Sequence, residues 1–316
     1  MDPDRSRSRD PPERLSPASR IRSGSSLSVL HRSRTGHPRG DRVLSGRERA
    51  RRVVPNKFPA LKPTPTETPR RTGPWTEFRG FGLHELVVLS PRHVESYSEL
   101  DGPERGTSFV AFQDRIRLAW TWPDIRHAVL FQNCRVDAGA SIRHVHSQLI
   151  ATAVVPPEIA RRHQRQQSHR EATGQTLLES IVADERREQG RVVLERDGFV
   201  AFCPYASRLS YELWIAPDEP SAEPFEGLTT ERLGRLADLL HAAVIALEGT
   251  LPGIAYNFVI HLPPRVPGET SSGHWWIELF PRINKLAGFE LATGCMINQV
   301  PPDIAAGRLR DHIPAA

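Results

Sequence analysis

The chain has 316 residues, of which 38% are hydrophobic and 25% charged, so it is long enough for one large globular domain or for two smaller ones. No apolar run approaches the roughly 20 residues of a membrane span, and the Arg-rich start lacks the apolar stretch of a secretory signal, so we expect a cytoplasmic protein. The three cysteines, Cys134, Cys203 and Cys295, are odd in number and widely spaced, which argues against a disulfide framework.

The net charge of +5 comes from the first 50 residues. Residues 1–50 hold 12 Arg against 6 Asp and Glu, so the rest of the chain is close to neutral. This segment is also rich in Ser, has no Lys and shows neither helical nor strand periodicity. We therefore predict a disordered tail over residues 1–50 and do not expect it to bind nucleic acid, although basic arms of this kind exist.

Regular structure is predicted from residue 51 onward. Apolar and alternating runs predict strands at 51–56, 84–90, 128–133, 147–155, within 191–205, and at 211–218, 255–263 and 274–283. Helical spacing predicts helices at 107–121, 157–168, 174–188 and 229–249. The last helix begins at Thr229 and Thr230, which are N-cap candidates, and its predicted end is Gly249.

The two halves of this region repeat each other. The stretch GLHELVVLSPRHVESYSEL aligns with RLSYELWIAPDEPSAEPFEGL, and RHVHSQLIAT aligns with GHWWIELFPR. In this register His144 falls on His274, His146 on Trp276, and Gln148 on Glu278. The halves therefore look like one α+β unit that was duplicated, with the chemistry kept in the first copy. We predict domains at 51–190 and 191–316.

The stretch GASIRHVHSQLIAT, residues 139–152, carries the most chemistry. In a strand, residues i, i+2 and i+4 share a face, so His144, His146 and Gln148 would point the same way. A neutral imidazole is a competent nucleophile toward phosphorus when a hydrogen bond to its other nitrogen fixes the tautomer. The residues alone leave two alternatives open, because such histidines can also face solvent or form a structural metal pair.

Donors for a phosphoryl group are available beside these histidines. Ser141 follows Gly139 in what we expect to be a tight loop, where backbone N–H groups and a hydroxyl can approach an anion. Gln148 and Asn133 can donate from their carboxamide groups as charge develops. The set is consistent with nucleotidyl transfer through a phosphohistidine-type intermediate.

The stretch NCRVDAGASIRHVHSQ resembles the active-site segment of galactose-1-phosphate uridylyltransferases, a branch of the histidine-triad superfamily. The resemblance extends over RVVPNKFPAL, GLHELVVLSPRH, FCPYASRLSYELWIAP and HWWIELFPRINKLAGFELATGCMIN, in that order. The last stretch is especially similar to the branch that includes ADP-glucose phosphorylase-like enzymes. The resemblance implies an α+β fold made of a tandem pair of histidine-triad-like domains, each an antiparallel sheet with flanking helices.

The resemblance also implies roles and partners. His146 would attack the α-phosphorus of a nucleotide sugar and expel a hexose 1-phosphate, and a hexose 1-phosphate or phosphate would then take the nucleotidyl group from it. Gln148, Ser141 and Asn133 would hold the substrate. Asn56 would lie by the nucleoside, although it can also be a plain turn residue after Pro55.

The expected activity is that of a UDP-glucose:hexose-1-phosphate uridylyltransferase that acts as a homodimer and needs no organic cofactor. The alternatives are an ADP-sugar phosphorylase, which uses phosphate as the acceptor, and a non-catalytic nucleotide-binding relative.

Zinc is the metal that the resemblance implies, and its site looks incomplete. Family members bind it through two cysteines of a CxxC pair and two histidines, and only His93 and His144 stand at the matching positions here. Structural zinc requires four ligands. At a second family metal site Trp276 and Glu278 occupy the expected ligand positions, so we expect no metal there and predict that His274 is a core histidine.

The missing cysteines suggest a hypothesis about the reading frame. The segment LSVLHRS at 27–33 can be encoded so that the next phase reads Cys-Pro-Phe-Cys-Thr-Gly-His, a zinc knuckle of the form expected there. On this hypothesis residues 1–50 are a frameshift product, and the Arg and Ser bias without Lys reflects a GC-rich gene read out of frame.

Overall fold

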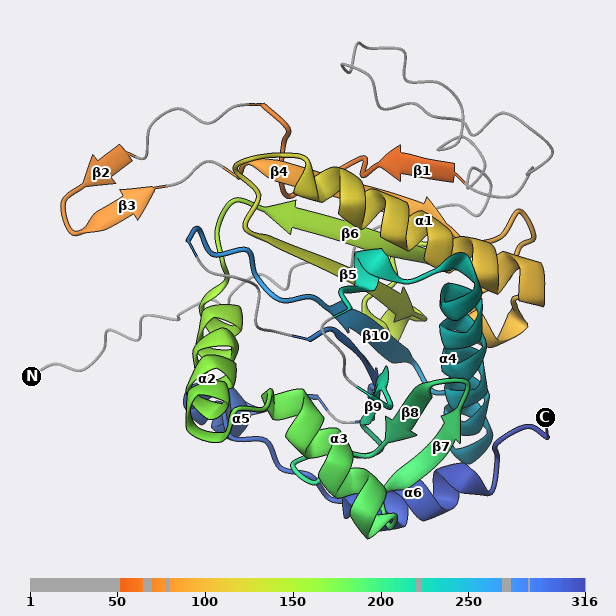
Figure 1. The fold of residues 1–316 in the computed structure, drawn as a ribbon. Helices are drawn as coiled ribbons and strands as arrows, with labels where there is room; N and C mark the ends of the chain where they lie inside the picture. Colours follow the sequence, from red (N-terminus) through yellow and green to blue (C-terminus); the bar gives the residue numbers. More distant parts are fainter. Residues whose placement is uncertain are drawn as a thin grey trace, which may run out of the picture. The chain divides into compact units, whose positions relative to one another are not determined.

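The main sheet is antiparallel, with its strands in the order β1-β4-β6-β5-β10-β11-β9-β8-β7 (Figure 1). Its strands are β1 (Arg52–Pro55), β4 (Gly82–Val88), β5 (His127–Cys134), β6 (His146–Thr152), β7 (Val192–Arg196), β8 (Phe199–Phe202), β9 (Leu213–Pro217), β10 (Tyr256–His261) and β11 (Trp276–Pro281). Burial alternates along β5 and β6, whereas β8 is buried throughout. A separate hairpin pairs β2 (Arg70–Thr72) with β3 (Trp75–Glu77).

The computed structural model describes residues 52–64, 70–77, 80–219, 223–268, 274–283 and 285–315. The predicted tail at 1–50, with its proposed frameshift origin, lies outside the described residues. The helices are α1 (Gly102–Trp120), α2 (Pro157–Thr173), α3 (Leu177–Glu188), α4 (Thr230–Thr250), α5 (Gly288–Thr293) and α6 (Pro302–Arg310). Short 3-10 turns occur at η2 (Tyr97–Glu99), η3 (Val136–Ala138) and η4 (Phe225–Gly227).

The predicted helices are confirmed, with shifts at their ends. Thr229 caps α4 as predicted, because its hydroxyl accepts from the main-chain N–H of Arg232. The end predicted at Gly249 is wrong, since the helix runs on to Thr250 and Leu251 is its C-cap. Helix α1 begins five residues before the predicted 107, because Asp101 caps it and a proline is tolerated in the first turn.

The internal repeat is visible in the order of the strands. Strands β4, β6 and β5 of the first half and β10, β11 and β9 of the second half occupy mirrored places, and β5 pairs with β10 where the halves meet. Leu86 lies opposite Gln148 in the first half, and Trp214 lies opposite Glu278 in the second. The halves thus share one continuous sheet, and a domain boundary between residues 190 and 191 stays a prediction.

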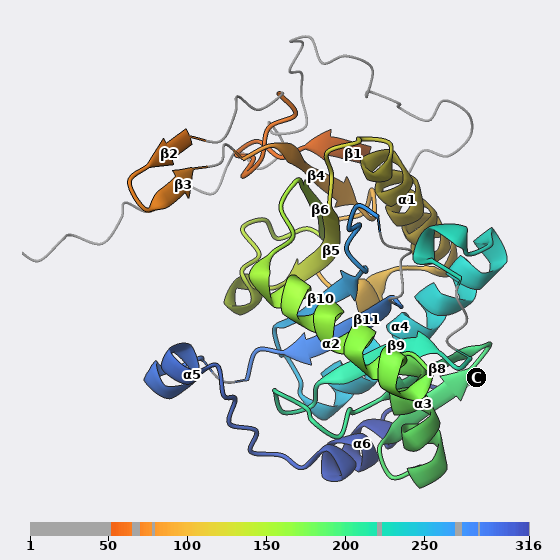
Figure 2. The same ribbon diagram turned by 60° about the vertical axis from the view of Figure 1, so that its left-hand side comes forward.

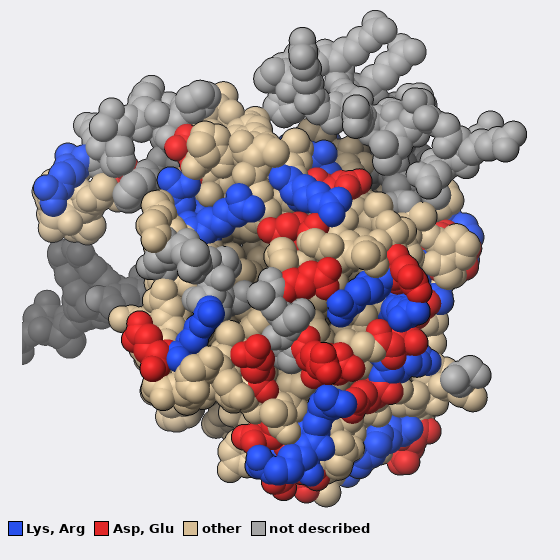
Figure 3. All heavy atoms as spheres, viewed as in Figure 1, with Lys and Arg blue, Asp and Glu red and all other residues tan. Residues whose placement is uncertain are grey.

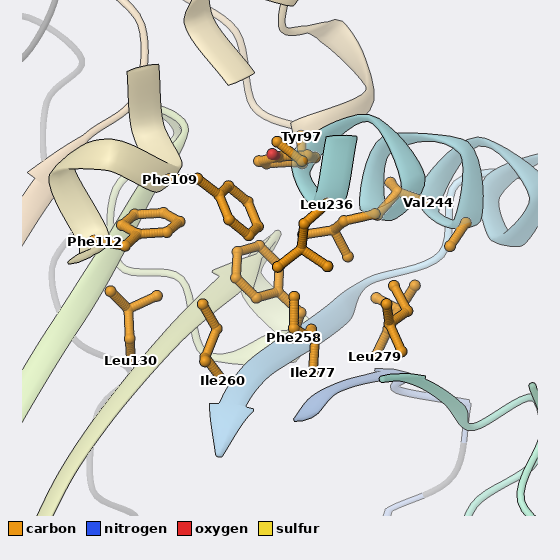
Figure 4. Packing of buried hydrophobic residues seen from close by; sticks show 14 of the residues in the cluster. Tyr97, Phe109, Phe112, Leu130, Leu236, Val244, Phe258, Ile260, Ile277 and Leu279 are labelled. Carbon is orange, nitrogen blue, oxygen red and sulfur yellow. The ribbon is translucent and has the colours of Figure 1, made fainter. Parts of the chain in front are cut away.

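The main core lies between one face of the sheet and helices α1 and α4. Figure 4 shows Phe109 and Phe112 of α1 and Leu236 of α4 pointing toward Phe258 of the central strand β10. All four side chains are fully buried. Burial of one such side chain stabilises the fold by about 1.5–3 kcal/mol. This core fixes the seam between β5 and β10, on which the candidate site depends.

The opposite face of the second half is covered by α2 and α3. Leu178 and Val182 of α3 pack in one buried cluster with Phe202 and Trp276. Arg162 of α2 lies over the Trp276 ring, 5.6 Å from its centroid, and Figure 2 shows both helices in front of the second-half strands. In the second half, helices therefore cover the sheet positions that match His146 and Gln148.

Candidate active site

The chain enters β6 through a bend that contains His144. The main-chain N–H of Val145 donates to the Val94 carbonyl at 2.7 Å, and Leu89 N–H donates to the Val145 carbonyl at 3.2 Å. Regular pairing of β6 begins only at His146. The prediction that His144 lies on the strand is therefore wrong, because its segment pairs with the loop after β4, whereas His146 and Gln148 do share a strand and a face.

His146 is held in one tautomer by the main chain. Its side chain is buried, and its Nδ1 lies 2.7 Å from the carbonyl oxygen of His144. Because a carbonyl oxygen only accepts, Nδ1 carries the hydrogen and Nε2 keeps its lone pair. Burial lowers the pKa of His146, against the opposing effect of this hydrogen bond. The imidazole is therefore neutral and nucleophilic near pH 7.

Gln148 is held by a residue that the sequence did not single out. His84 of β4 places its Nε2 2.9 Å from Gln148 Oε1, and its Nδ1 accepts from the main-chain N–H of Ala60 at 3.0 Å. Since Nδ1 accepts, Nε2 carries the hydrogen and donates to Gln148. Asn56 Nδ2 lies 3.0 Å from His84 Nε2 and 3.4 Å from the same oxygen, and since both nitrogens carry hydrogens, both donate toward Gln148 Oε1. The Gln148 carbonyl is thus occupied, and its NH2 group is left to donate elsewhere.

Asn56 lies at the end of β1, half-buried beside His84 and Gln148. Its Oδ1 accepts from the main-chain N–H of Phe58 at 2.9 Å, which fixes the direction of the amide. The structure therefore brings Asn56 and Gln148 together, as the predicted site requires. A turn role for Asn56 is also present, because the Phe58 contact closes a local turn.

Asn133 lies at the end of the pairing between β5 and β6. Gln132 is opposite Ser147 in that register, and continuing the register by one residue would set Asn133 opposite His146. Side chains of such a pair point to the same face at close range. Ser141 lies exposed in the bend between η3 and β6. The structure thus brings His146, Gln148, Asn133 and Asn56 to one region, with Ser141 on the segment that leads into it.

His93 and His144 are neighbours, as the zinc prediction requires, with ring centroids 5.9 Å apart. Their rings are inclined by 60°. Within the described ranges no group of three or more His, Cys, Asp and Glu side chains is arranged to hold a metal ion. The described residues therefore do not fit a complete structural zinc site, which needs four ligands.

The matching positions in the second half hold an ion-pair network in place of His146 and Gln148. Trp276 stands where His146 stands in the first half, and its ring stacks on His261 at 4.5 Å. Glu278 accepts from His261 Nε2 at 2.6 Å and from Arg208. Burial alone would raise the pKa of Glu278, but the His261 hydrogen bond and the Arg208 charge lower it. His274 is buried, as predicted for a core histidine.

Charge on the described surface is mixed. In the view of Figure 3, Lys and Arg side chains are interspersed with Asp and Glu side chains and form no patch of one sign. In the part of the chain that the structure describes, no helix is long and apolar enough to cross a membrane. A cytoplasmic location and a homodimer stay predictions.

Known proteins match this chain over most of its length. A family model described as "Domain of unknown function (DUF4921)" matches residues 110–315. ADP-glucose phosphorylase of Arabidopsis thaliana is 31% identical over 264 residues, which are 82% of this chain and 74% of that protein. Galactose-1-phosphate uridylyltransferase of Streptomyces lividans is 27% identical over 194 residues, 58% of this chain but only 50% of that protein. The chain belongs to the galactose-1-phosphate uridylyltransferase family.

The fold agrees with membership of the galactose-1-phosphate uridylyltransferase family. The crystal structure of an ADP-glucose phosphorylase from Arabidopsis thaliana with bound ADP-glucose has a TM-score of 0.72 at 29% identity, over 83% of this chain and 82% of that one. The branch that includes ADP-glucose phosphorylase, expected from the C-terminal motif, is therefore confirmed. The named relatives are enzymes, whereas the roles of the individual site residues here stay predictions.

Proposed function

We propose that the chain is a nucleotidyltransferase that uses His146 as its covalent nucleophile. The observation that carries the proposal is the 2.7 Å contact between His146 Nδ1 and the His144 carbonyl, which leaves Nε2 unprotonated. A nucleophile needs a free lone pair and a fixed direction, and this contact supplies both. Gln148 and Asn133 flank the imidazole with carboxamide groups that can donate to phosphoryl oxygens.

The proposed reaction has two steps. Nε2 of His146 attacks the α-phosphorus of a nucleotide sugar, a P–N bond forms, and the bond from that phosphorus to the bridging oxygen breaks. The hexose 1-phosphate leaves with the bonding electron pair. The imidazole keeps its Nδ1 hydrogen and becomes cationic, which the His144 carbonyl stabilises. An oxygen of the acceptor then attacks the phosphorus, and the P–N electron pair returns to Nε2.

For the substrate, we propose an ADP-sugar with inorganic phosphate as the acceptor. The support is the 31% identity to an ADP-glucose phosphorylase, against 27% identity to the uridylyltransferase of Streptomyces lividans. This reverses the order expected from the sequence motifs. The second candidate is uridylyl transfer from UDP-glucose to a hexose 1-phosphate, and it is supported by the name of that second relative.

The covalent intermediate is tested by labelling. The protein is mixed with ADP-glucose or UDP-glucose that carries 32P at the α-phosphorus, without acceptor, and then denatured and digested. We expect label on the peptide that contains His146, with release of glucose 1-phosphate. His146→Ala should abolish labelling, and His312→Ala, an exposed histidine near the C-terminus, should label normally. Full labelling of His146→Ala would contradict the proposal.

Turnover assays separate the candidates. Each nucleotide sugar is offered with phosphate and with galactose 1-phosphate as acceptor. The proposal expects the fastest turnover with ADP-glucose and phosphate. Fastest turnover with UDP-glucose and galactose 1-phosphate would support uridylyl transfer. Binding of nucleotide without labelling or turnover would instead identify a non-catalytic relative.

A further inference from the structure

A buried asparagine of the second half contacts the site across the seam of the sheet. Asn257 lies on β10, 8% exposed, directly opposite Asn133 of β5. Its Nδ2 donates to Asn133 Oδ1 at 2.8 Å and to the main-chain carbonyl of Ala138 at 2.9 Å. Both hydrogens of one NH2 group are therefore used, and both go to the segment that lines the first-half site.

The Ala138 carbonyl determines the direction of both amides. A main-chain carbonyl only accepts, so the Asn257 atom that faces Ala138 must be nitrogen. The same nitrogen faces Asn133, and the Asn133 atom that meets it must therefore be oxygen. Asn133 Nδ2 is consequently turned away from Asn257, and its contact to the Gly139 carbonyl is long, at 3.4 Å.

The contact with Ala138 also fixes the loop. Turn η3 lies between Arg135, which has a φ of 68°, and Gly139, which has a φ of 91°. Such angles are costly for a non-glycine residue and persist only where surrounding contacts hold them. The Asn257 hydrogen bond to Ala138 and the ion pair of Arg135 with Glu248, at 3.3 Å, are two such contacts.

We propose that Asn257 is a positioning residue, which directs the NH2 group of Asn133 toward a phosphoryl oxygen of the group transferred to His146. The inference rests on the proposed function. Its consequence is that the second half, which has lost the nucleophile, still supplies a part of the first-half site. Asn257 itself does not touch the reacting atoms.

The test compares Asn257→Asp with Asn257→Ala. The Asp side chain has almost the same shape but presents only acceptors to Asn133 and Ala138, so it loses the Ala138 contact and Asn133 must turn its NH2 group inward, away from the substrate. The Ala side chain leaves Asn133 free to adopt either direction. Loss of one such donor costs on the order of 100-fold in rate at well-studied sites. We expect His146 labelling in a single turnover to slow by about tenfold or more for Asp, and by less for Ala.

The labelling rates of the two variants, compared with each other, separate a positioning role of Asn257 from a packing role. A packing role predicts that Ala, which removes volume, is the worse of the two, and that order would overturn the proposal. Nucleotide-sugar affinity should change by less than about threefold in either variant, because the donor acts on developing charge. Rates are referred to the folded fraction, measured by thermal unfolding. Asn298→Asp, a matched change at a half-buried amide near the C-terminus, should label at the wild-type rate.

A double-mutant cycle tests whether Asn257 acts through Asn133. In an Asn133→Ala background, Asn257→Asp should slow labelling clearly less than in the wild-type background, since only the lost contact to Ala138 remains to act. An undiminished loss in that background overturns the proposal.

Absence of labelling in the wild-type protein would reject the proposed function instead. The orientation of the Asn133 amide would then be followed by NMR of protein labelled with 15N-asparagine. Asn257→Asp must shift the Asn133 side-chain signals, and Asn298→Asp must not. Unmoved signals would also overturn the proposal.

Discussion

His84 should set the rate of nucleotidyl transfer through Gln148, although it does not contact the transferred group. We expect His84→Leu to slow His146 labelling by about five- to tenfold. The lost contact is the 2.9 Å hydrogen bond from Nε2 to Gln148 Oε1, between two uncharged groups. Such a bond contributes about 1 kcal/mol, and each 1.4 kcal/mol corresponds to about tenfold in rate. The remaining Asn56 contact to the same oxygen is 3.4 Å long and cannot replace it.

The assay is rapid-quench labelling with the 32P nucleotide sugar at saturating concentration, so that the rate reports the chemical step. His84→Gln places an amide NH2 near the position of the ring Nε2 and should recover most of the rate, to within about threefold. His169→Leu, on α2, removes a histidine that contacts only Ser180 among the described residues and is the matched control. The reasoning is refuted if His84→Leu labels at the wild-type rate, or if His84→Gln is as slow as His84→Leu.

Three other predictions concern pH, stability and metal. Burial lowers the pKa of His146, and His146 must be unprotonated to attack phosphorus, so labelling should be lost only as the pH falls below 6.5, the ordinary pKa of histidine. A pH profile with its midpoint at or above 6.5 would contradict this. Gly82→Ala would place a Cβ 1.9 Å from a main-chain oxygen of β6 at a φ of 147°, so urea unfolding should show a loss of at least about 2 kcal/mol. Gly234→Ala in α4, which meets nothing within 4 Å, should instead raise stability by about 0.5–1 kcal/mol. Chelator competition should find weak zinc binding by this chain, since the described part of the chain offers only His93 and His144 at that site. A chain rebuilt in the alternate frame should bind about one zinc tightly, and tight binding by the present chain would oppose the frameshift hypothesis.

The strands and long helices could be predicted because their signals are local. Alternation and helical spacing gave every strand of the main sheet and the first four helices to within a few residues. The hairpin of β2 and β3 was missed, since its three-residue strands are all exposed where they are described and carry no apolar pattern. Helix α5 was missed for a similar reason, because none of its residues is buried.

The candidate site was predictable only in part. His146 and Gln148 follow from their spacing on one strand, whereas His84 and Asn257 act through contacts with residues 64 and 124 positions away. The periodicity of a sequence does not reveal contacts between residues so far apart. One signal was available for His84, which precedes the apolar part of a predicted strand that pairs with β6. His144 was misplaced because its neighbour Val145 bonds to the loop at Val94, a competition that strand spacing does not contain.

The pairing of β5 with β10 makes the first half dependent on the second. A fragment that ended before β7 would expose β5 as an unpaired edge, with a row of free main-chain donors and acceptors. Such an edge recruits another chain, so the isolated first half should associate with itself or aggregate. In the intact chain the second half covers that edge from within the same polypeptide. A second half with Trp276 in the place of His146 is therefore still required, because without it the strand that carries Asn133 would have no partner on that side.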